Sequence, residues 1–380
     1  MRVTCLQQDL QRALSITGRA VASRTTLPVL SNYLIEAEED ALTVSATNLE
    51  LGITCRIPAR VDEPGKAALQ ARVLNDFVSS LSSGEVQLYE DSGPTTMLVK
   101  QGATQAHVRG QDPDEFPAVT PESTPAAALT VDSGLLSEAI AQVVFAAATD
   151  DSRPVLAGVH IESEGTKLAL AAADGFRMSF REMDIGRELE NDISIVVPAR
   201  SMQEIARIIA DSEEPAEISI TPNQAQMIVS IPDITVVTRL IDGTFPDLKQ
   251  IIPQEWNTRT VVSREVLLDA ARRAAIFARS NNDVVKFALE PAGGADGIGR
   301  MTITATAADT GDNRDDLDAQ VEGSELEVAF NGRYLTDVLS VLGSPSVALE
   351  LQGPNAAGVF KPVDDDSFVH VIMPMVIGAN

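Results

Sequence analysis

The segment ARVLNDFVSSL, at residues 71–81, decides the fold because two later segments repeat it. The matching segments are ARSMQEIARII at residues 199–209 and GRYLTDVLSVL at residues 332–342. The arginine at the second position recurs after 128 and then 133 residues, close to one third of the 380-residue chain. A fixed period of this length indicates several copies of one structural unit.

Alternating strands recur with nearly the same period. The segments LTVSATN at 42–48, LALAAAD at 168–174 and MTITATAAD at 301–309 each end in a polar residue. Phe-Pro pairs at 116–117 and 245–246 close the first two copies, and Met-Pro at 373–374 closes the third. Breaker residues mark linkers at 120–128 and 253–258. We therefore predict three domains, at residues 1–122, 123–254 and 255–380.

Each copy reads as a strand, a helix and three strands, and then the same order again. The helices have apolar residues spaced three and four apart, whereas strands such as residues 86–89 alternate between apolar and polar. Helices on one face of antiparallel sheets make an α+β architecture. The six predicted helices are residues 7–20, 72–81, 133–148, 200–211, 263–280 and 332–342.

Charge is unevenly divided between these helices and the rest of the chain. The net charge of −26 by itself disfavours phosphate binding. The six helices, however, carry +1, 0, −1, 0, +2 and 0, a net of +2, so the remainder carries −28. If the helices share one surface, that surface can bind a phosphate backbone weakly and without base readout. The alternative is that helical segments simply favour arginine over aspartate.

Six motifs in chain order resemble one known family, the bacterial DNA sliding clamp. They are TLPVL at 26–30, ATNLE at 46–50, AADGFR at 172–177, LIDGTFPD at 240–247, FNGRYL at 330–335 and VIMPM at 371–375. The resemblance implies a DNA-clamp fold of three similar domains. It also implies that two chains join head to tail in a ring, with helices lining the inside and sheets outside. The chain would be a processivity factor without a catalytic site, and it would encircle duplex DNA without reading its sequence.

The resemblance also implies partners and the residues that bind them. Replicative polymerase, clamp loader, mismatch-repair and translesion proteins would dock short extended peptides into a hydrophobic pocket. Adaptable methionines suit varied peptide side chains, and arginine and asparagine offer hydrogen bonds. The expected pocket residues are Leu156, Asp174, Gly175, Phe176, Arg177, Met178, Pro246, Asn331, Tyr334, Val359, Val371, Ile372, Met373, Pro374 and Met375. For an apolar terminal strand such as residues 373–375, packing on the core is the alternative.

Positions for DNA and for the second chain follow in the same way. The residues expected to face DNA are Arg24, Arg72, Arg153, Arg200 and Arg279. Ile276 and Phe277 are expected at the ring joint, facing a strand near Ala106. The chain departs from the family pattern in its extension after Met375 and at Gln250, where a basic residue is frequent.

The sequence contains no recognisable motif for a cofactor or a catalytic site. Cys5 and Cys55 form no CxxC pair and are predicted to be buried free thiols. The three histidines are widely separated, so no metal site and no cofactor are expected. The glycine run at 294–299 lacks the Lys-Ser/Thr ending of a phosphate loop and is predicted to be a hairpin loop. The acidic segments at 309–318 and 364–366 are predicted to be solvated turns.

Two other functions fit parts of the sequence. A tandem-domain scaffold would share the repeat, and an acidic hydrolase would need a cleft with perturbed carboxylates. The chain has no run of about 18 apolar residues, which disfavours a membrane span. Its N-terminus lacks the apolar region of a signal peptide. We therefore expect a cytoplasmic protein.

Overall fold

A computed structural model describes residues 1–91, 93, 95–121, 123, 129–150, 152–186, 192–292 and 298–376. The chain divides into two compact units. The first unit consists of Met1–Ser137 and Arg200–Leu240, and the second consists of Glu138–Ala199 and Ile241–Asn380. Within the described ranges, no helix is both long and apolar enough to cross a membrane.

The first unit is built on one antiparallel sheet. Among the described residues its strand order is β10-β15-β16-β17-β4-β3-β2-β6-β9-β8-β7-β1-β5. Its elements are β1 (Arg2–Leu6), α1 (Gln7–Thr17), β2 (Asn32–Glu38), β3 (Ala41–Thr47), β4 (Leu51–Pro58), β5 (Arg60–Glu63), β6 (Gly65–Gln70), α2 (Ala71–Ser79), β7 (Glu85–Glu90), β8 (Thr96–Gln101), β9 (Thr104–Gln111), β10 (Leu129–Val131), β15 (Ala216–Ile220), β16 (Gln226–Ile231) and β17 (Ile234–Arg239).

The second unit has the same design. Its described strands follow the order β14-β11-β12-β13-β25-β24-β23-β18-β21-β20-β19-β22. Its elements are β11 (Gly158–Glu164), β12 (Lys167–Ala173), β13 (Arg177–Asp184), β14 (Ser194–Pro198), β18 (Thr258–Ser263), α5 (Arg264–Ala278), β19 (Val284–Glu290), β20 (Gly299–Ala307), β21 (Gly311–Gly323), β22 (Leu326–Asn331), α6 (Gly332–Val341), β23 (Ser346–Leu351), β24 (Gly358–Pro362) and β25 (Phe368–Ile372).

Two further helices, α3 (Ser133–Val144) and α4 (Ala199–Ile209), each contain a boundary between the units. Apart from the short β5, the elements repeat the order strand, helix and three strands six times. This confirms the predicted α+β class and the position of every predicted helix. All six helices end one to four residues before their predicted ends. The largest differences are at α1, which continues only as a short 3-10 turn (Gly18–Ala20), and at α3, which ends at Val144.

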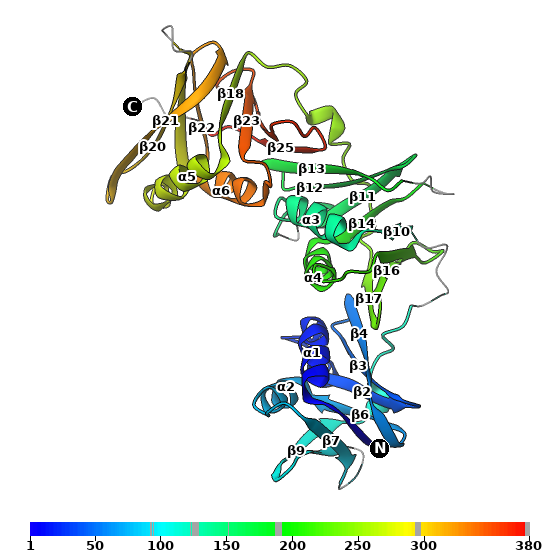
Figure 1. Cartoon of the computed structure of the whole chain (residues 1–380). Helices are drawn as coiled ribbons and strands as arrows, with labels where there is room; N and C mark the ends of the chain where they lie inside the picture. The colour runs from blue at the N-terminus through cyan, green and yellow to red at the C-terminus, as the bar shows by residue number, and fades with distance from the viewer. Residues whose placement is uncertain are drawn as a thin grey trace. The chain divides into compact units, whose positions relative to one another are not determined.

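Helix amphipathicity and strand alternation build the cores. In β7, Val86 and Leu88 are fully buried whereas Gln87 is exposed, as expected for a sheet that is covered on one face. In the second unit, α5 and α6 lie side by side (Figure 1). Beneath them the ring of Phe330 packs edge-on against two other buried phenylalanines, at centroid distances of 5.8 and 5.7 Å. Such tilted aromatic pairs stabilise a core beyond the area that they bury.

Both cysteines are buried free thiols, as predicted. Burial raises the pKa of the Cys5 thiol to about 12, with a smaller contribution from Asp9. Burial likewise raises the pKa of the Cys55 thiol to about 11. A thiol must ionise to react. We therefore expect the native chain at pH 7.5 to leave Ellman's reagent unreacted, whereas the guanidinium-unfolded chain releases two equivalents of thionitrobenzoate. Rapid reaction of either thiol in the native chain would contradict this burial.

The acidic segment after β20 differs from the prediction. Only Asp309 lies in a turn, and the other aspartates lie along β21. The segment pairs with β20 as a strand, and two of its aspartates also pair with arginines: Asp315 accepts from Arg273 at 2.8 Å, and Asp316 accepts from Arg314 at 3.1 Å. The segment at 364–366 is indeed a turn, between β24 and β25. The strands that flank the glycine run, β19 and β20, pair antiparallel, while residues 293–297 lie outside the described residues.

Candidate functional site

The second unit contains a largely apolar cavity of about 240 Å³. It lies where the neighbouring strands β12 and β25 end and β13 begins. The walls come from the loop between β12 and β13, from the chain after β25, from the 3-10 turn before β11, and from the segment after Phe245. The lining residues are Arg153, Leu156, Ala173, Gly175, Phe176, Arg177, Met178, Pro246, Leu248, Ile251, Val371 and Met373.

The loop from Asp174 to Arg177 holds its shape through one carboxylate. Asp174 Oδ1 accepts hydrogen bonds from the backbone nitrogens of Phe176 and Arg177, at 2.8 and 3.0 Å. Gly175 has a φ of +94°, and an added Cβ would lie 2.8 Å from a guanidinium nitrogen of Arg153. The positive φ favours glycine at this position, and a larger residue would displace the guanidinium of Arg153.

Arg177 connects the loop to residues far away in the chain. Its side chain is only 9% exposed and pairs with Asp174 at 3.1 Å and with Asp337 at 2.6 Å. A third guanidinium nitrogen donates to the carbonyl oxygen of Phe145 at 2.7 Å. The guanidinium also lies 4.2 Å from the ring centroid of Tyr334. The three guanidinium nitrogens lie in one plane and each donates to a different segment of the chain. Arg177 therefore fixes the positions of these segments in the pocket wall.

The residues behind Arg177 are polar but tightly packed. Burial raises the pKa of the Tyr334 hydroxyl, with a further contribution from Asp174. His370 is fully buried beside the ring of Phe145, and its Nδ1 lies 2.6 Å from the hydroxyl of Ser179. Burial, followed by the nearby Arg177 charge, lowers the pKa of His370 well below its ordinary value. This histidine is therefore neutral at physiological pH and supports the core.

The chain after β25 is pinned on both sides of the pocket rim. The backbone nitrogen of Met373 donates to the carbonyl of Phe176 at 2.8 Å, and that of Met375 donates to the carbonyl of Ala329 at 2.8 Å. The side chains of Phe176, Ile251 and Met373 are 63, 53 and 47% exposed. Large apolar groups that are exposed together around a concavity are typical of a binding site.

The structure brings most of the predicted pocket residues to this cavity. Eight line it directly: Leu156, Gly175, Phe176, Arg177, Met178, Pro246, Val371 and Met373. Asp174 and Tyr334 contact Arg177 behind the wall. Asn331 caps α6 by accepting from two backbone nitrogens. Val359 and Ile372 are buried in the core, and Pro374 and Met375 continue the terminal segment.

Four lining residues were not predicted for the pocket. Arg153 was expected to face DNA, but its Nη2 donates to the carbonyl of Asp174 at 2.7 Å in the pocket wall. Ala173 precedes the loop, while Leu248 and Ile251 follow the Phe-Pro pair. The available signal for Leu248 and Ile251 was their apolar character at a spacing of three residues behind Pro246.

The first unit repeats the loop with other side chains. Asn48 Oδ1 accepts from the backbone nitrogens of Glu50 and Leu51, at 3.0 and 2.8 Å, in the same pattern as Asp174. Leu49 occupies the position of the glycine, with a φ of +77°. The shared turn shows that the two loops are structural equivalents.

The strand next to the loop matches as well. Arg239 donates its backbone nitrogen to the carbonyl of Glu50 at 2.8 Å, as Met373 does to Phe176. Glu50 therefore stands at the position of Phe176, and Arg239 stands at the position of Met373. The cavity there, of about 300 Å³, has a polar rim that includes Gln226. Of these two equivalent loops, the one in the second unit borders the more apolar cavity.

The other residues expected to face DNA are exposed arginines. Arg24 lies in a loop before β2, Arg72 and Arg200 lie in the first turns of α2 and α4, and Arg279 follows α5. The side chain of Arg72 is 94% exposed and pairs with Asp76 at 3.8 Å.

Three arginines beside α1 and α4 were missed. Arg12, Arg19 and Arg207 line a cleft of about 430 Å³ in the first unit. Glu204 accepts from Arg19 at 2.9 Å and from Arg207 at 2.8 Å. The seven-residue spacing of Arg12 and Arg19, two helical turns, was the sequence signal.

The residues predicted for the ring joint differ in their exposure to solvent. Ile276 is 62% exposed on α5, whereas Phe277 packs partly against the core. Ala106 on β9 is half-buried. Within the described part of the chain, no group of three or more His, Cys, Asp or Glu residues is arranged to hold a metal ion.

Comparisons with known proteins agree along the whole chain. Family models of the DNA polymerase III beta subunit match in succession: the N-terminal domain at 1–120, the central domain at 130–247 and the C-terminal domain at 249–376. The beta sliding clamps of Synechocystis and Bacillus subtilis are 32 and 28% identical, and 99% of each chain is covered.

Solved structures give the same result. The DNA polymerase sliding clamp of Bacillus subtilis matches with a TM-score of 0.92 at 27% identity over 100% of both chains. The DNA polymerase III beta subunit of Thermotoga maritima matches with a TM-score of 0.90 at 26% identity, over 99% of this chain and 100% of that one. From the ordered domain matches, the relatives and the six-fold repeat of its elements, this chain belongs to the beta sliding clamp family of DNA polymerase III.

Proposed function

We propose that two copies of this chain close head to tail into a ring that encircles duplex DNA and tethers the replicative polymerase to it. The observation that carries this proposal is the match of all three clamp domains, in order, over 99% of the chain. The role is topological and needs no catalytic step. The three predicted domains, at 1–122, 123–254 and 255–380, would each supply two helices to the inside of the ring.

The distribution of charge supports this role. The six helical segments are together slightly basic, while the rest of the chain carries the negative charge. An inner surface of this kind attracts phosphates weakly, and an acidic outer surface repels stray DNA. We propose that Arg24, Arg72, Arg200 and Arg279, together with Arg12, Arg19 and Arg207, supply the backbone contacts. Because phosphate contacts carry no base information, the ring can slide.

The apolar cavity of the second unit supports the docking of partners. Its exposed rim of Phe176, Ile251 and Met373 would cover apolar side chains of an extended peptide. We propose that polymerase, clamp loader, mismatch-repair and translesion proteins share it through short segments. The flexible side chains of Met178 and Met373 suit several peptide sequences.

Retention on closed DNA tests the proposal. The purified chain is loaded onto nicked circular DNA, and half of the sample is then linearised. We expect the protein to stay on circles and to leave linear molecules by sliding off the free ends. Equal loss from both forms would remove the encircling role and favour a scaffold with the same fold.

The size of the particle gives a second test. Sedimentation is expected to report a particle of twice 40.4 kDa, joined in part through Ile276, which is 62% exposed on α5. Replacing Ile276 with aspartate places a charge in that joint and is expected to shift the particle toward the monomer. A dimer that Ile276→Asp leaves unchanged would place the joint elsewhere on the surface.

Replacement of Arg24 is expected to have a small effect. Each phosphate contact contributes a small part of the binding free energy, so Arg24→Ala should weaken DNA binding by severalfold at most. The slope of the logarithm of the binding constant against the logarithm of salt concentration should fall by about one in magnitude. Binding measured at several salt concentrations checks this, with Arg56→Ala on the acidic sheet as the matched control. Loss of ring formation would instead make Arg24 a structural residue.

A further inference from the structure

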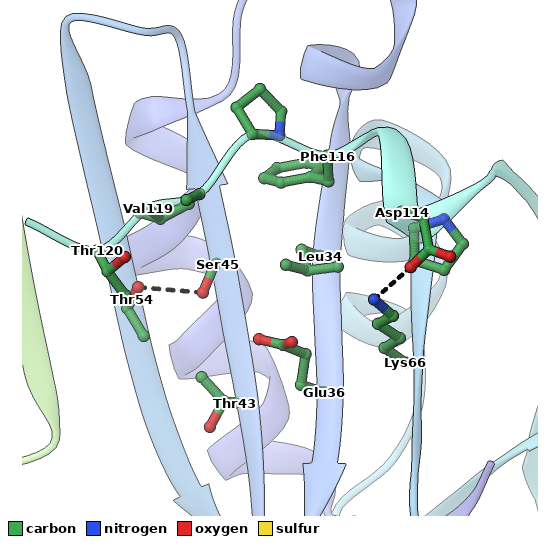
Figure 2. A pocket seen from close by; sticks show the side chains of 13 residues that line it. Leu34, Glu36, Thr43, Ser45, Thr54, Lys66, Asp114, Phe116, Val119 and Thr120 are labelled. Atoms are coloured by element: carbon green, nitrogen blue, oxygen red, sulfur yellow. Dashed lines mark hydrogen bonds and ion pairs between the residues drawn. The ribbon is translucent and has the colours of Figure 1, made fainter. Parts of the chain in front are cut away.

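A second cavity, of about 430 Å³, lies in the first unit under the segment from Phe116 to Thr120 (Figure 2). Three neighbouring strands form its floor. Leu34 and Glu36 come from β2, Thr43 and Ser45 come from β3, and Thr54 comes from β4. Phe116 forms the roof. This site is separate from the apolar pocket, which belongs to the other unit.

The repeat within the chain explains why this cavity is open. Strand pairing places three floor residues in one row across the sheet, and the second unit has an equivalent row 126 residues later. The rows are Leu34, Ser45 and Thr54 in the first unit, and His160, Ala171 and Phe180 in the second.

Aromatic side chains occupy the equivalent position in the second unit. Phe180 packs into a core cluster there, and the ring of His160 stacks on that of Phe245 at a centroid distance of 5.0 Å. In the first unit Thr54 replaces Phe180, and its hydroxyl bonds to that of Ser45 at 3.0 Å. The smaller and polar side chain leaves space where the other unit is filled.

The charges around the cavity are shared unequally, because the Lys66 ammonium is attracted mainly by Asp114 and more weakly by Glu36. Lys66 pairs with Asp114 at the rim (Figure 2). Among the described residues, no ion pair or hydrogen bond reaches the side chain of Glu36, which is half-buried on the floor. With these three charged groups the lining has a net charge of −1, on a chain whose total is −26.

We propose that this cavity is a docking site for an extended peptide of a partner protein, which inserts an arginine side chain. A guanidinium can donate two parallel hydrogen bonds to the Glu36 carboxylate. The hydroxyl of Thr43 offers a further acceptor. Arginine uses both groups, whereas a neutral side chain leaves the Glu36 carboxylate without a charge-assisted hydrogen bond.

An extended chain fits better than a small ligand because the site has a second part. The cavity beside Glu50, of about 300 Å³, shares four lining residues, Pro117 to Thr120, with the arginine site. Leu49, which is 45% exposed, and Val237 give that second cavity apolar surface. A peptide lying along Pro117 to Thr120 can therefore place an arginine in one cavity and an apolar side chain in the other.

Methyl NMR of the full-length chain tests the site with two probes. The first is the peptide acetyl-Gly-Arg-Gly-Leu-amide, and the second carries citrulline, a neutral analogue of arginine, in place of the arginine. The arginine peptide is expected to shift the methyl signals of Leu34 and Val119 saturably. The citrulline peptide should bind roughly tenfold more weakly, because a charge-assisted pair is replaced by a neutral one.

Three variants separate the site from its surroundings. Glu36→Gln keeps the shape and is expected to weaken the arginine peptide roughly tenfold, while Glu162→Gln, at the equivalent position in the second unit, should leave it unchanged. Thr54→Phe should abolish binding by filling the cavity as Phe180 does.

Other results would overturn the proposal. These are the absence of saturable shifts, equal affinity for both peptides, unchanged binding to Glu36→Gln, or shifts confined to Leu156 in the apolar pocket. None of these measurements involves DNA, so their failure is distinguishable from failure of the proposed clamp function.

Discussion

Replacing Arg177 with alanine is expected to destabilise the second unit by about 3 kcal/mol. The guanidinium is 9% exposed, and its removal leaves Asp174 Oδ2 and the carbonyl of Phe145 without this donor in a poorly hydrated site, while Asp174 Oδ1 keeps its two backbone donors. Asp337, at 31% exposure, recovers part of its loss from water. An unpaired buried carboxylate costs more than the pair itself contributes to stability.

Urea unfolding followed by tryptophan emission measures this effect. Trp256 is the single tryptophan of the chain and belongs to the second unit, so its emission reports on that unit. Arg314→Ala is the matched control, because that arginine and its partner Asp316 are 59 and 44% exposed; it should change stability by about 1 kcal/mol or less. Arg177→Lys, which keeps the charge without the planar fork, should fall between them. Equal stability of Arg177→Ala and Arg314→Ala would mean that Arg177 does not hold the pocket together.

Truncation before Met373 is expected to reduce peptide binding by about 100-fold or more. β25 ends at Ile372, so the sheet keeps its strand while the pocket loses a wall. The cut also removes the hydrogen bond from Met373 to the carbonyl of Phe176, which steadies the opposite rim. The loss combines the apolar contact of one methionine with the mobility gained by the loop.

Fluorescence polarisation with a labelled extended peptide that carries a glutamine and several apolar side chains measures the loss. A shorter truncation that removes only residues 377–380 is the matched control and should bind the peptide like the full chain. Both truncated chains are expected to keep the dimeric size, because the proposed ring joint lies on α5. Unchanged affinity after the longer truncation would overturn the assignment of the pocket.

Much of the fold was predictable because its signals are local and periodic. Apolar residues at helical spacing located α1 to α6, and alternation in segments such as 42–48 and 168–174 located strands. Early ends of helices, as at Val144, were not predicted, since the end of a helix depends on contacts that its own residues do not encode. The acidic run after Asp309 was read as a turn because its arginine partner, Arg273, is 42 residues away.

The sequence by itself determined that this chain has six strand-helix-three-strand units, two buried thiols and a set of clamp motifs in order. The motif resemblance pointed to the loop at 174–177 for the pocket, but tertiary structure decided which side chains close its walls. The turn made by Asn48 and that made by Asp174 are nearly the same, yet Glu50 faces one cavity and Phe176 the other. Tertiary structure also placed Arg153 in the pocket wall and brought Arg177 to Asp337, 160 residues away. A periodic sequence pattern predicts helices and strands because residues close together in the chain determine local backbone geometry. A pocket is formed by side chains from distant segments, which come into contact only when the chain folds.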